Sequence, residues 1–359
     1  MCSMDVRVGF YTIALNERQF VERWHESCKD GDYLLIADTG STDGTVELAE
    51  SLGINVVQVR VSPWRFEVAR NASLAAMPLD LDYCVALDMD EVVLPGWREE
   101  LQRAKDQGWT RPRYKYTWSW ESEGVPGLQY GGDKIHARKN YRWKHPVHEV
   151  LLPYPPQHEV QGWTSSLEIH HHPDSAKSRS QYMPLLRMAV DEDLHDDRNA
   201  FYYARELYYH GQYEEATVQF KRHLALPNAT WAPERAASYR FLSKCDPVNR
   251  EEWLTEAIKT APGSREPYVD LAQYYYELSA WTQCLAVAES ALQITEKPLE
   301  YLCEAEAWGS KPYDLAAISA HQLNLHVKAL QYGKIARALA PDDERLAKNL
   351  DFYEAALRA

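Results

Sequence analysis

The chain has 359 residues, of which 45% are hydrophobic and 26% are charged, and its formal net charge is −14. These values are typical of folded globular proteins, and the length favours two domains over one. The acidic balance makes nucleic acid an unfavourable partner, because binding a phosphate backbone requires a basic face.

Cysteine usage and hydropathy indicate a cytoplasmic protein. The six cysteines show no CxxC spacing, and several lie in apolar stretches, as expected for reduced thiols. No apolar run is as long as a membrane span, and the first residues show no signal-peptide pattern. We therefore expect a cytoplasmic location and no membrane span.

Strands and helices alternate in the first hundred residues. Apolar, β-rich runs predict strands at 7–15, 33–37, 54–61 and 83–87. Helical spacing of apolar residues predicts helices at 20–28, 46–52 and 64–77, between these strands. Such alternation indicates βαβ units, and hence an α/β domain with a Rossmann-like, mainly parallel sheet.

The fourth predicted strand ends abruptly in three carboxylates, Asp88, Asp90 and Glu91. Side chains two residues apart on a strand share a face, so Asp88 and Asp90 can converge while Met89 points into the core. Two neighbouring carboxylates suit Mg²⁺ or Mn²⁺, which prefer carboxylate and phosphate oxygens. The alternative is a solvated acidic turn after a strand.

Other polar residues follow the earlier strands and should meet these carboxylates at one edge of the sheet. An Asp after the second strand can bind a base or ribose, and an Arg can neutralise phosphate oxygens. Each side chain also has a purely structural alternative, such as capping a turn. No GxGxxG or P-loop motif is present. The residues expected to converge are Asn16, Asp38, Asp43, Arg70, Asp88 and Asp90.

Four ordered segments resemble the family 2 glycosyltransferases, which have a GT-A fold and use nucleotide-activated sugars; the segments are 13–17, 36–45, 66–71 and 87–91. The resemblance covers roughly residues 5–175. It implies an inverting transfer, a UDP-sugar donor, and a metal and diphosphate motif at Asp88 and Asp90. The nucleotide-binding residues that we predict are Asn16, Glu17, Asp38, Asp43, Arg70 and Asp88.

An inverting transfer needs a base for the acceptor hydroxyl. Residues 145–149 are similar to a stretch of family members that carry helical repeats, and we predict Glu149 as the base, next to His148. The family's usual motif is an acidic pair, and here it is His-Glu. Glu149 could instead only hold His148 in place, and the rival bases are Asp133, Asp174 and Glu91.

The segment 169–174 contains three consecutive histidines. Strand alternation would bring His170 and His172 together, and we predict that they are metal ligands alongside Asp88 and Asp90. The alternative is a solvated strand end. Upstream, the alternating aromatics of a strand at 113–120 suit a sugar or glycan, or equally a hydrophobic face against the core.

The second half resembles tetratricopeptide repeats. Units of 34 residues beginning near Asp197 and Arg265, and one near Ser310, place small residues where paired helices must approach closely. The segment 231–262 fits less well, with Arg250 at a small position. We predict a GT-A domain at 1–178 and an all-α repeat domain at 179–359.

Together these features predict a metal-dependent glycosyltransferase that moves a sugar from a UDP-sugar to a hydroxyl of a glycan, protein or other acceptor. The repeats could bind the acceptor or a protein partner, mediate homodimerisation, or only buttress the catalytic half. The alternatives are a non-catalytic repeat scaffold, a transferase acting on modified DNA bases, and a nucleotidyltransferase.

Overall fold

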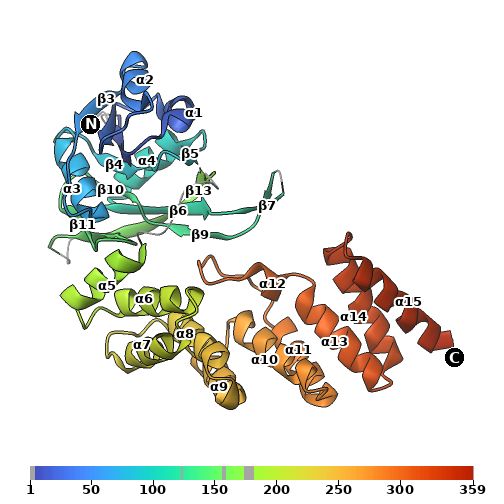
Figure 1. Cartoon of the computed structure of the whole chain (residues 1–359). Helices are drawn as coiled ribbons and strands as arrows, with labels where there is room; N and C mark the ends of the chain where they lie inside the picture. Colours follow the sequence, from blue (N-terminus) through green and yellow to red (C-terminus); the bar gives the residue numbers. More distant parts are fainter. Residues whose placement is uncertain (1–4, 123, 156–158, 174–181, 359) are drawn as a thin grey trace. The chain divides into compact units, whose positions relative to one another are not determined.

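The computed structural model describes residues 5–122, 124–155, 159–173 and 182–358. The chain divides into two compact units, Met1–Ala189 and Val190–Ala359. The first contains strands and helices and the second is built from helices, which confirms the predicted order of an α/β domain and an all-α domain (Figure 1). The predicted boundary at 178/179 lies outside the described residues.

A five-stranded sheet forms the centre of the first unit, in the order β10-β4-β1-β2-β3. Strands β1 to β4 are parallel where they pair, and β10 is antiparallel to β4. The carboxyl ends of β1, β2 and β4 therefore meet at one edge, as predicted. The bounds are β1 Val8–Ala14, β2 Tyr33–Asp38, β3 Asn55–Gln58, β4 Tyr83–Ala86 and β10 Ile135–Ala137.

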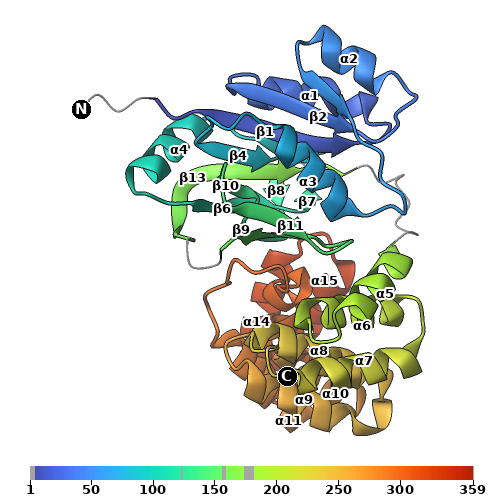
Figure 2. The ribbon, with the colours of Figure 1, turned by 90° about the vertical axis from the view of Figure 1, so that its left-hand side faces the viewer.

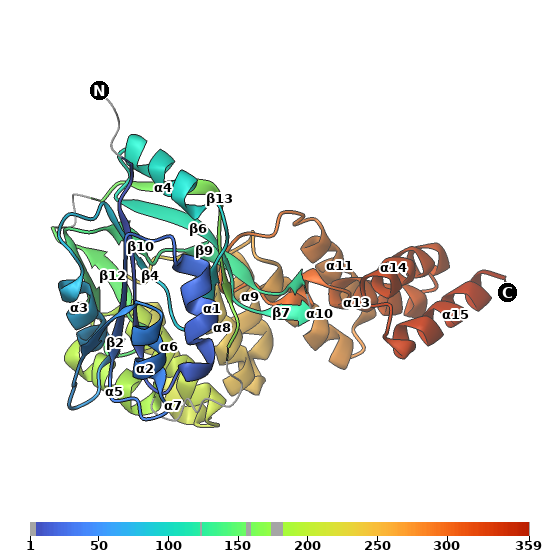
Figure 3. The ribbon, with the colours of Figure 1, turned by 90° about the horizontal axis from the view of Figure 1, so that it is seen from above.

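Helices cover both faces of this sheet. Helices α1 (Arg18–Cys28), α2 (Thr45–Ser51) and α4 (Trp97–Asp106) contribute to the core on one face, and α3 (Phe66–Ala76) to the core on the other. Figure 2 shows α1 and α2 side by side, and Figure 3 shows α1 and α3 on opposite sides of β2.

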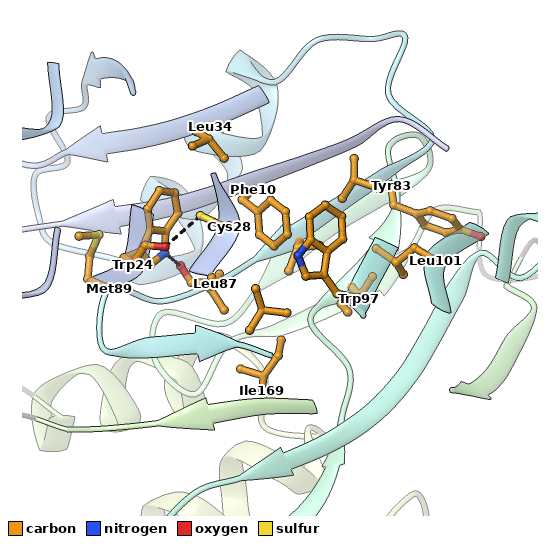
Figure 4. Packing of buried hydrophobic residues seen from close by; sticks show 14 of the residues in the cluster. Phe10, Trp24, Cys28, Leu34, Tyr83, Leu87, Met89, Trp97, Leu101 and Ile169 are labelled. Atoms are coloured by element: carbon orange, nitrogen blue, oxygen red, sulfur yellow. Dashed lines mark hydrogen bonds between the residues drawn. The ribbon is translucent and has the colours of Figure 1, made fainter. Parts of the chain in front are cut away.

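Trp24 of α1 ties the core to the edge of the sheet where the acidic residues emerge (Figure 4). Its side chain is fully buried, and its indole Nε1 donates a hydrogen bond to the carbonyl oxygen of Leu87 at 2.9 Å. Met89 is buried in the same cluster, as predicted. The chain is thus fixed on both sides of Asp88 by buried apolar side chains.

A second sheet follows in the order β5-β13-β6-β9, with β13 parallel to β6 and the other pairs antiparallel. The strand predicted at 113–120 is observed slightly earlier, as β6. The bounds are β5 Glu91–Val93, β6 Arg111–Thr117, β9 Gln129–Gly132 and β13 Gln161–His171; the two hairpins are β7–β8 (Trp120–Ser122, Val125–Pro126) and β11–β12 (Tyr141–Lys144, Val150–Pro153).

Helices of the second unit pack as antiparallel pairs, after α5 (Tyr182–Glu192). Across the described parts of the chain, none of the helices has both the length and the apolar composition that crossing a bilayer requires. The pairs are α6 Asp197–Tyr209 with α7 Tyr213–Ala225, α8 Ala232–Cys245 with α9 Arg250–Thr260, α10 Arg265–Glu277 with α11 Trp281–Leu292, and α13 Lys311–Gln322 with α14 His326–Leu339; η2 (Pro247–Asn249), α12 (Ala305–Trp308) and α15 (Glu344–Arg358) complete the unit.

Small residues let these helices approach closely, as the repeat pattern predicts. Ala204, Ala216, Ala272 and Ala329 are all fully buried. The poorly fitting position, Arg250, begins α9 and turns its guanidinium outward to an ion pair with Glu277 at 2.6 Å. One large residue is therefore accommodated at the surface without interrupting the stack.

His136 on β10 provides a test of the first unit. Its Nε2 lies 3.0 Å from the hydroxyl of Tyr11, its Nδ1 lies 2.8 Å from the carbonyl oxygen of Ala137, and burial lowers the pKa of His136 to about 3. As the pH falls below the ordinary histidine pKa of about 6.5, the unfolded chain binds a proton that the native chain does not. The free energy of unfolding should therefore decrease as the pH is lowered below about 6.5. This histidine contributes at most about 1.4 kcal/mol to that decrease per pH unit.

We expect His136→Gln to be less stable than the parent at pH 7.5 and the difference to shrink toward pH 5. Hydrogen exchange of the β1 and β4 amides, corrected for intrinsic rates, measures this stability. The control is His25→Gln on α1, where the histidine is only partly buried. Parallel pH profiles for the parent and His136→Gln would contradict the assignment.

Candidate active site at the carboxyl edge of the sheet

The loop after β2 is braced by the polar residues that were predicted to bind a nucleotide. The Asp38 carboxylate accepts hydrogen bonds from the backbone N–H groups of Gly40 at 3.0 Å and Ser41 at 3.1 Å. Asn16, in the left-handed region at φ 56°, accepts from the N–H of Thr42 through Oδ1 at 2.8 Å. Asn16 and Asp38 therefore lie in one hydrogen-bonded rim that joins the ends of β1 and β2.

Asp43 caps two helices in the same rim. Its Oδ2 accepts from the N–H of Arg18 and its Oδ1 from the N–H of Thr45, both at 3.0 Å. Desolvation raises the pKa of Asp43, but the hydrogen bonds from Thr45 and Arg18 outweigh it and lower the pKa. The backbone of buried Glu17 joins the rim by donating to the Thr45 hydroxyl at 2.9 Å.

Arg70 of α3 brings two predicted site carboxylates together. Its Nη1 lies 2.8 Å from Oδ1 of Asp88, and its Nε donates to Oε1 of Glu149. The guanidinium lies over the ring of Trp143, 5.0 Å from the centroid. Arg70, Asp88 and Glu149 are separated in the sequence, and the fold brings them together around one guanidinium. The residues expected to converge included Arg70 and Asp88 but not Glu149.

Lys134 is a second cation in this cluster, and sequence reasoning missed it. Its Nζ lies 2.8 Å from Oδ2 of Asp88 and 2.6 Å from Oε1 of Glu91. Glu91 also accepts from the hydroxyl of Tyr116 at 2.6 Å and from the N–H of Asp88 at 2.8 Å. Charges therefore alternate from Glu149 through Arg70, Asp88 and Lys134 to Glu91.

Burial and charge act in opposite directions on these groups. Burial raises the pKa of Asp88, but Arg70 and Lys134 outweigh it and hold the pKa well below its usual range. Burial also raises the pKa of Glu91, and there the opposing effect of Lys134 does not cancel it. Arg70 and Lys134 together thus favour the ionised form of Asp88 more strongly than Lys134 alone favours that of Glu91.

Asp90 takes different partners from Asp88. The two residues lie in a turn between β4 and β5, and not on a continued strand, as the hydrogen bond from the N–H of Glu91 to the carbonyl of Asp88 at 2.9 Å indicates. Oδ2 of Asp90 lies 3.4 Å from Nε2 of His171, whose Nδ1 lies 2.9 Å from the carbonyl of Trp118. Desolvation lowers the pKa of His171, but these two acceptors raise it overall.

The imidazole rings of His170 and His172 both contact the indole ring of Trp120. Their ring centroids lie 4.8 and 5.5 Å from it, and the two imidazole centroids are 6.1 Å apart. Nε2 of His170 lies 2.9 Å from Oε1 of Glu168. Strand alternation therefore brings His170 and His172 together, as expected, while His171 between them contacts Asp90.

The predicted metal can be compared with the donors that are present. Within the described residues, no group of three or more His, Cys, Asp or Glu side chains is arranged to hold a metal ion. Both oxygens of Asp88 already face cations, whereas the partly exposed Asp90 faces a single imidazole. Mg²⁺ is usually bound by one or two carboxylates, waters and substrate phosphates. Asp90 together with a bound diphosphate fits that pattern.

The rival bases differ in accessibility. Glu91 is 1% exposed and its oxygens face Lys134, Tyr116 and the Asp88 N–H, so it is poorly placed to receive a substrate proton. Asp133 is half-exposed and lies 3.6 Å from Arg111. Asp174 lies outside the described residues. Glu149, whose side chain is 11% exposed, is held through Oε1 by Arg70, the cation that it shares with Asp88.

Three further residues lie beside these carboxylates: Lys134, Glu91 and His171. Neither Lys134 nor His171 was predicted as a site residue. Lys134 directly precedes β10, which pairs antiparallel with β4 and so returns beside Asp88. His171 is opposite Glu91 in the register between β13 and β5. The positions of Lys134 and His171 both depend on strand pairing between segments that are distant in the sequence. No local sequence pattern reveals this pairing.

The first unit is an α/β domain with a charged cluster at the carboxyl edge of its sheet, and the comparison with protein families identifies this domain. Residues 10–118 match the family described as glycosyl transferase family 2. The amino-terminal part of the chain therefore contains a glycosyl transferase family 2 domain, which confirms the predicted family. The match includes Asn16, Asp38, Arg70 and Asp88, and it ends before Lys134 and Glu149.

Two relatives carry matching names. The chain is 28% identical over 161 residues to "Lipopolysaccharide core biosynthesis glycosyltransferase LpsC" of Rhizobium meliloti (strain 1021), an alignment that covers 40% of this chain and 56% of that protein. It is 33% identical over 97 residues to an "Uncharacterized glycosyltransferase" of Rickettsia bellii (strain RML369-C), covering 27% and 32%. The chain thus spans less than two thirds of each relative. These names agree with the predicted enzyme class.

Solved structures similar to this chain include tetratricopeptide repeat proteins. YrrB, described as a TPR protein with an unusual peptide-binding site, has a TM-score of 0.39 at 12% identity and covers 48% of this chain and 84% of its own. PilF of Pseudomonas aeruginosa has a TM-score of 0.37 at 16% identity, covering 48% and 72%.

Replacing Lys134 tests how much the alternating charges contribute to the stability of the first unit. In Lys134→Met, partly buried Asp88 and fully buried Glu91 lose their shared cation, and the loss should reach at most about 3–5 kcal/mol, the cost of breaking a fully buried pair. The control is Lys115→Met, where a half-exposed lysine pairs with Glu168 and the loss should stay below about 1 kcal/mol. Hydrogen exchange of the β4 amides measures both variants. Equal losses would show that Lys134 contributes no more than a surface ion pair.

Proposed function

We propose that the protein transfers a sugar from a nucleoside-diphosphate sugar, a UDP-sugar, to a hydroxyl of a glycan or protein, with inversion at the sugar. The observation that carries the proposal is the charged cluster of Arg70, Asp88 and Lys134 at the carboxyl edge of the sheet. It lies next to Asp90, in a domain of a glycosyltransferase family. Carboxyl edges of this kind bind nucleotides in open α/β sheets.

In this proposal the rim of Asn16, Asp38 and Asp43 receives the nucleoside. The hydrogen bonds within the rim fix its shape before the ligand arrives, which lowers the entropy lost on binding. Arg70 and Lys134 hold Asp88 in one orientation, so that Asp88 can bind the sugar nucleotide without rearranging.

Asp90, with His170 and His172 as further candidates, would hold a divalent ion, Mn²⁺ or Mg²⁺. When bound, such an ion neutralises the charge that develops on the diphosphate. The residues of the protein would then hold the acceptor oxygen in line with the anomeric carbon and exclude water from the reacting atoms.

Glu149 is the proposed base. The acceptor oxygen forms a bond to the anomeric carbon, the bond from that carbon to the diphosphate oxygen breaks, and the hydroxyl proton passes to Glu149. Arg70 binds Oε1 of Glu149, so Oε2 is the oxygen that would accept the proton. The neighbouring His148 lies in the left-handed backbone region at φ 48°.

Calorimetric titration with UDP tests the donor site. We expect UDP to bind the parent chain in the presence of Mn²⁺, and Asp90→Asn to weaken binding at least tenfold. The control is Asp106→Asn, which removes a carboxylate at the end of α4 and should bind like the parent. If neither UDP nor GDP binds with or without Mn²⁺, the proposal that the protein is a glycosyltransferase is wrong. A non-catalytic repeat scaffold would then be the better interpretation.

Turnover tests the base, once a donor sugar has been found by screening UDP release. Glu149→Gln should lower kcat by about 10²–10⁴-fold, the usual contribution of a general base, and leave UDP affinity nearly unchanged. The matched control is Asp133→Asn, the half-exposed rival. A larger loss in Asp133→Asn than in Glu149→Gln would assign the base to Asp133.

A further inference from the structure

The carboxylate proposed as the base lies at the end of a hairpin connection that belongs to neither of the larger sheets. In the described part of the chain, β11 and β12 pair only with each other, and residues 145–149 connect them. Two residues of this connection, His145 and His148, have left-handed backbones at φ 80° and 48°. An isolated two-stranded hairpin is at best marginally stable in water. The position of Glu149 therefore depends on contacts between the hairpin and the rest of the first unit.

Asn71 of α3 holds the edge of this hairpin through its side-chain amide. Its Nδ2 donates to the carbonyl oxygen of Trp143 and its Oδ1 accepts from the N–H of Trp143, both at 2.9 Å. One amide thus pairs with both backbone groups of one β11 residue, as an adjacent antiparallel strand would. Edge strands otherwise leave such groups without protein partners. Figures 1 and 2 show α3 beside β11.

Two other residues of α3 hold the connection that follows β11. The N–H of Phe66 donates to the carbonyl oxygen of Pro146 at 3.1 Å, and Nε of Arg70 donates to Oε1 of Glu149. Together with the Asn71 amide, these contacts come from the first two turns of α3. They follow the chain from the end of β11 to Glu149, so α3 is the element against which the base is placed.

Trp143 is also held through its side chain. The residue is 4% exposed, and its indole Nε1 donates to the hydroxyl of Tyr11 on β1 at 2.9 Å. The guanidinium of Arg70 lies over its ring, 5.0 Å from the centroid. Trp143 is therefore bonded to α3 through its backbone and to β1 through its indole. The hairpin cannot slide along α3 without breaking both sets of hydrogen bonds.

Apolar packing alone would not define the register of the hairpin on α3. Asn is a poor helix former, so its place within α3 is not explained by helix stability. Hydrogen bonds are directional, and the Asn71 amide fits only one register of β11. A shift of one residue would move the strand by about 3.3 Å. A misplacement of only about 1 Å can cost about 10²-fold in rate, so register matters directly for a general base.

We propose that Asn71 is a positioning residue, which fixes the register of β11 on α3 and thereby places Glu149 against Arg70 with its other oxygen toward the acceptor. The inference rests on the proposed function, because it requires Glu149 to be the base. Asn71 acts through the hairpin backbone and does not itself touch the reacting atoms. Its loss should therefore affect only the step in which Glu149 takes part.

A double-mutant cycle on kcat in the full chain tests this inference. Asn71→Ala should lower kcat at least about tenfold, and it should leave the donor KM and the UDP affinity within about twofold of the parent values. In the Glu149→Gln background, the same replacement should lower kcat less than about twofold, because the base that Asn71 positions is already absent.

Two further variants complete the cycle. The control is Asn55→Ala on β3, which removes an amide that donates to the carbonyl oxygen of Leu34 at 3.0 Å, and its kcat should equal that of the parent. Asn71→Asp keeps the acceptor for the Trp143 N–H and loses only the donor. It should lower kcat less than Asn71→Ala does, and it replaces that variant if Asn71→Ala does not fold.

An equal loss of kcat from Asn71→Ala in both backgrounds would overturn the proposal, because Asn71 would then act on the fold and not through Glu149. Unchanged kcat in Asn71→Ala would also overturn it. Hydrogen exchange of the 141–144 amides provides a readout that needs no turnover. Asn71→Ala should speed this exchange at least about tenfold, and Asn55→Ala should not.

The exchange measurement also separates this inference from the proposed function. If the parent chain binds no nucleotide, the proposed function is wrong, whatever the exchange of the hairpin shows. If the parent binds UDP and turns over but the hairpin exchanges equally fast in Asn71→Ala, the proposed function stands and the positioning role of Asn71 is wrong.

Discussion

A line of alternating, largely buried charges links separate segments of the first unit. Glu149, Arg70, Asp88, Lys134 and Glu91 come from four separate segments, because Asp88 and Glu91 lie in one turn, and each cation lies between two carboxylates. Buried ions are costly unless each is paired, so these segments are stable only in the arrangement that pairs them all. The geometry around Asp88 is thereby set before any ligand binds, and the positions of Asp90 and Glu149 follow from it.

The rim that carries Asn16, Asp38 and Asp43 performs a different physical task. Its side chains saturate backbone N–H groups of the loop after β2 and of the first turns of α1 and α2. Structural and functional interpretations of these residues are compatible, because a rigid loop presents its remaining polar groups in fixed positions. Rigidity in the rim and charge in the buried cluster together describe a preorganised edge, which suits a multiply charged donor.

The helical half follows a simpler rule, since each pair packs mainly on its neighbours and small residues set the spacing. Ala204, Ala216 and Ala272 lie at positions that the repeat period predicts. The connection 293–310 between α11 and α13 departs from that rule. Its residues Tyr301 and Glu304 contact α8, which precedes them by many residues, and the 34-residue period does not reveal these contacts.

The sequence by itself determined the two fold classes, the family, the succession of strands along the chain up to Asp88, and the burial of Met89, because hydrophobic periodicity and local motifs report on residues close in the chain. Only the tertiary structure decided that Lys134 lies between Asp88 and Glu91, that His171 is the histidine facing Asp90, and that Tyr301 contacts α6 and α8. These contacts depend on strand register and on chain return over long separations. A one-residue shift in register would turn His170 or His172 toward Asp90 instead, and local sequence patterns do not specify that choice.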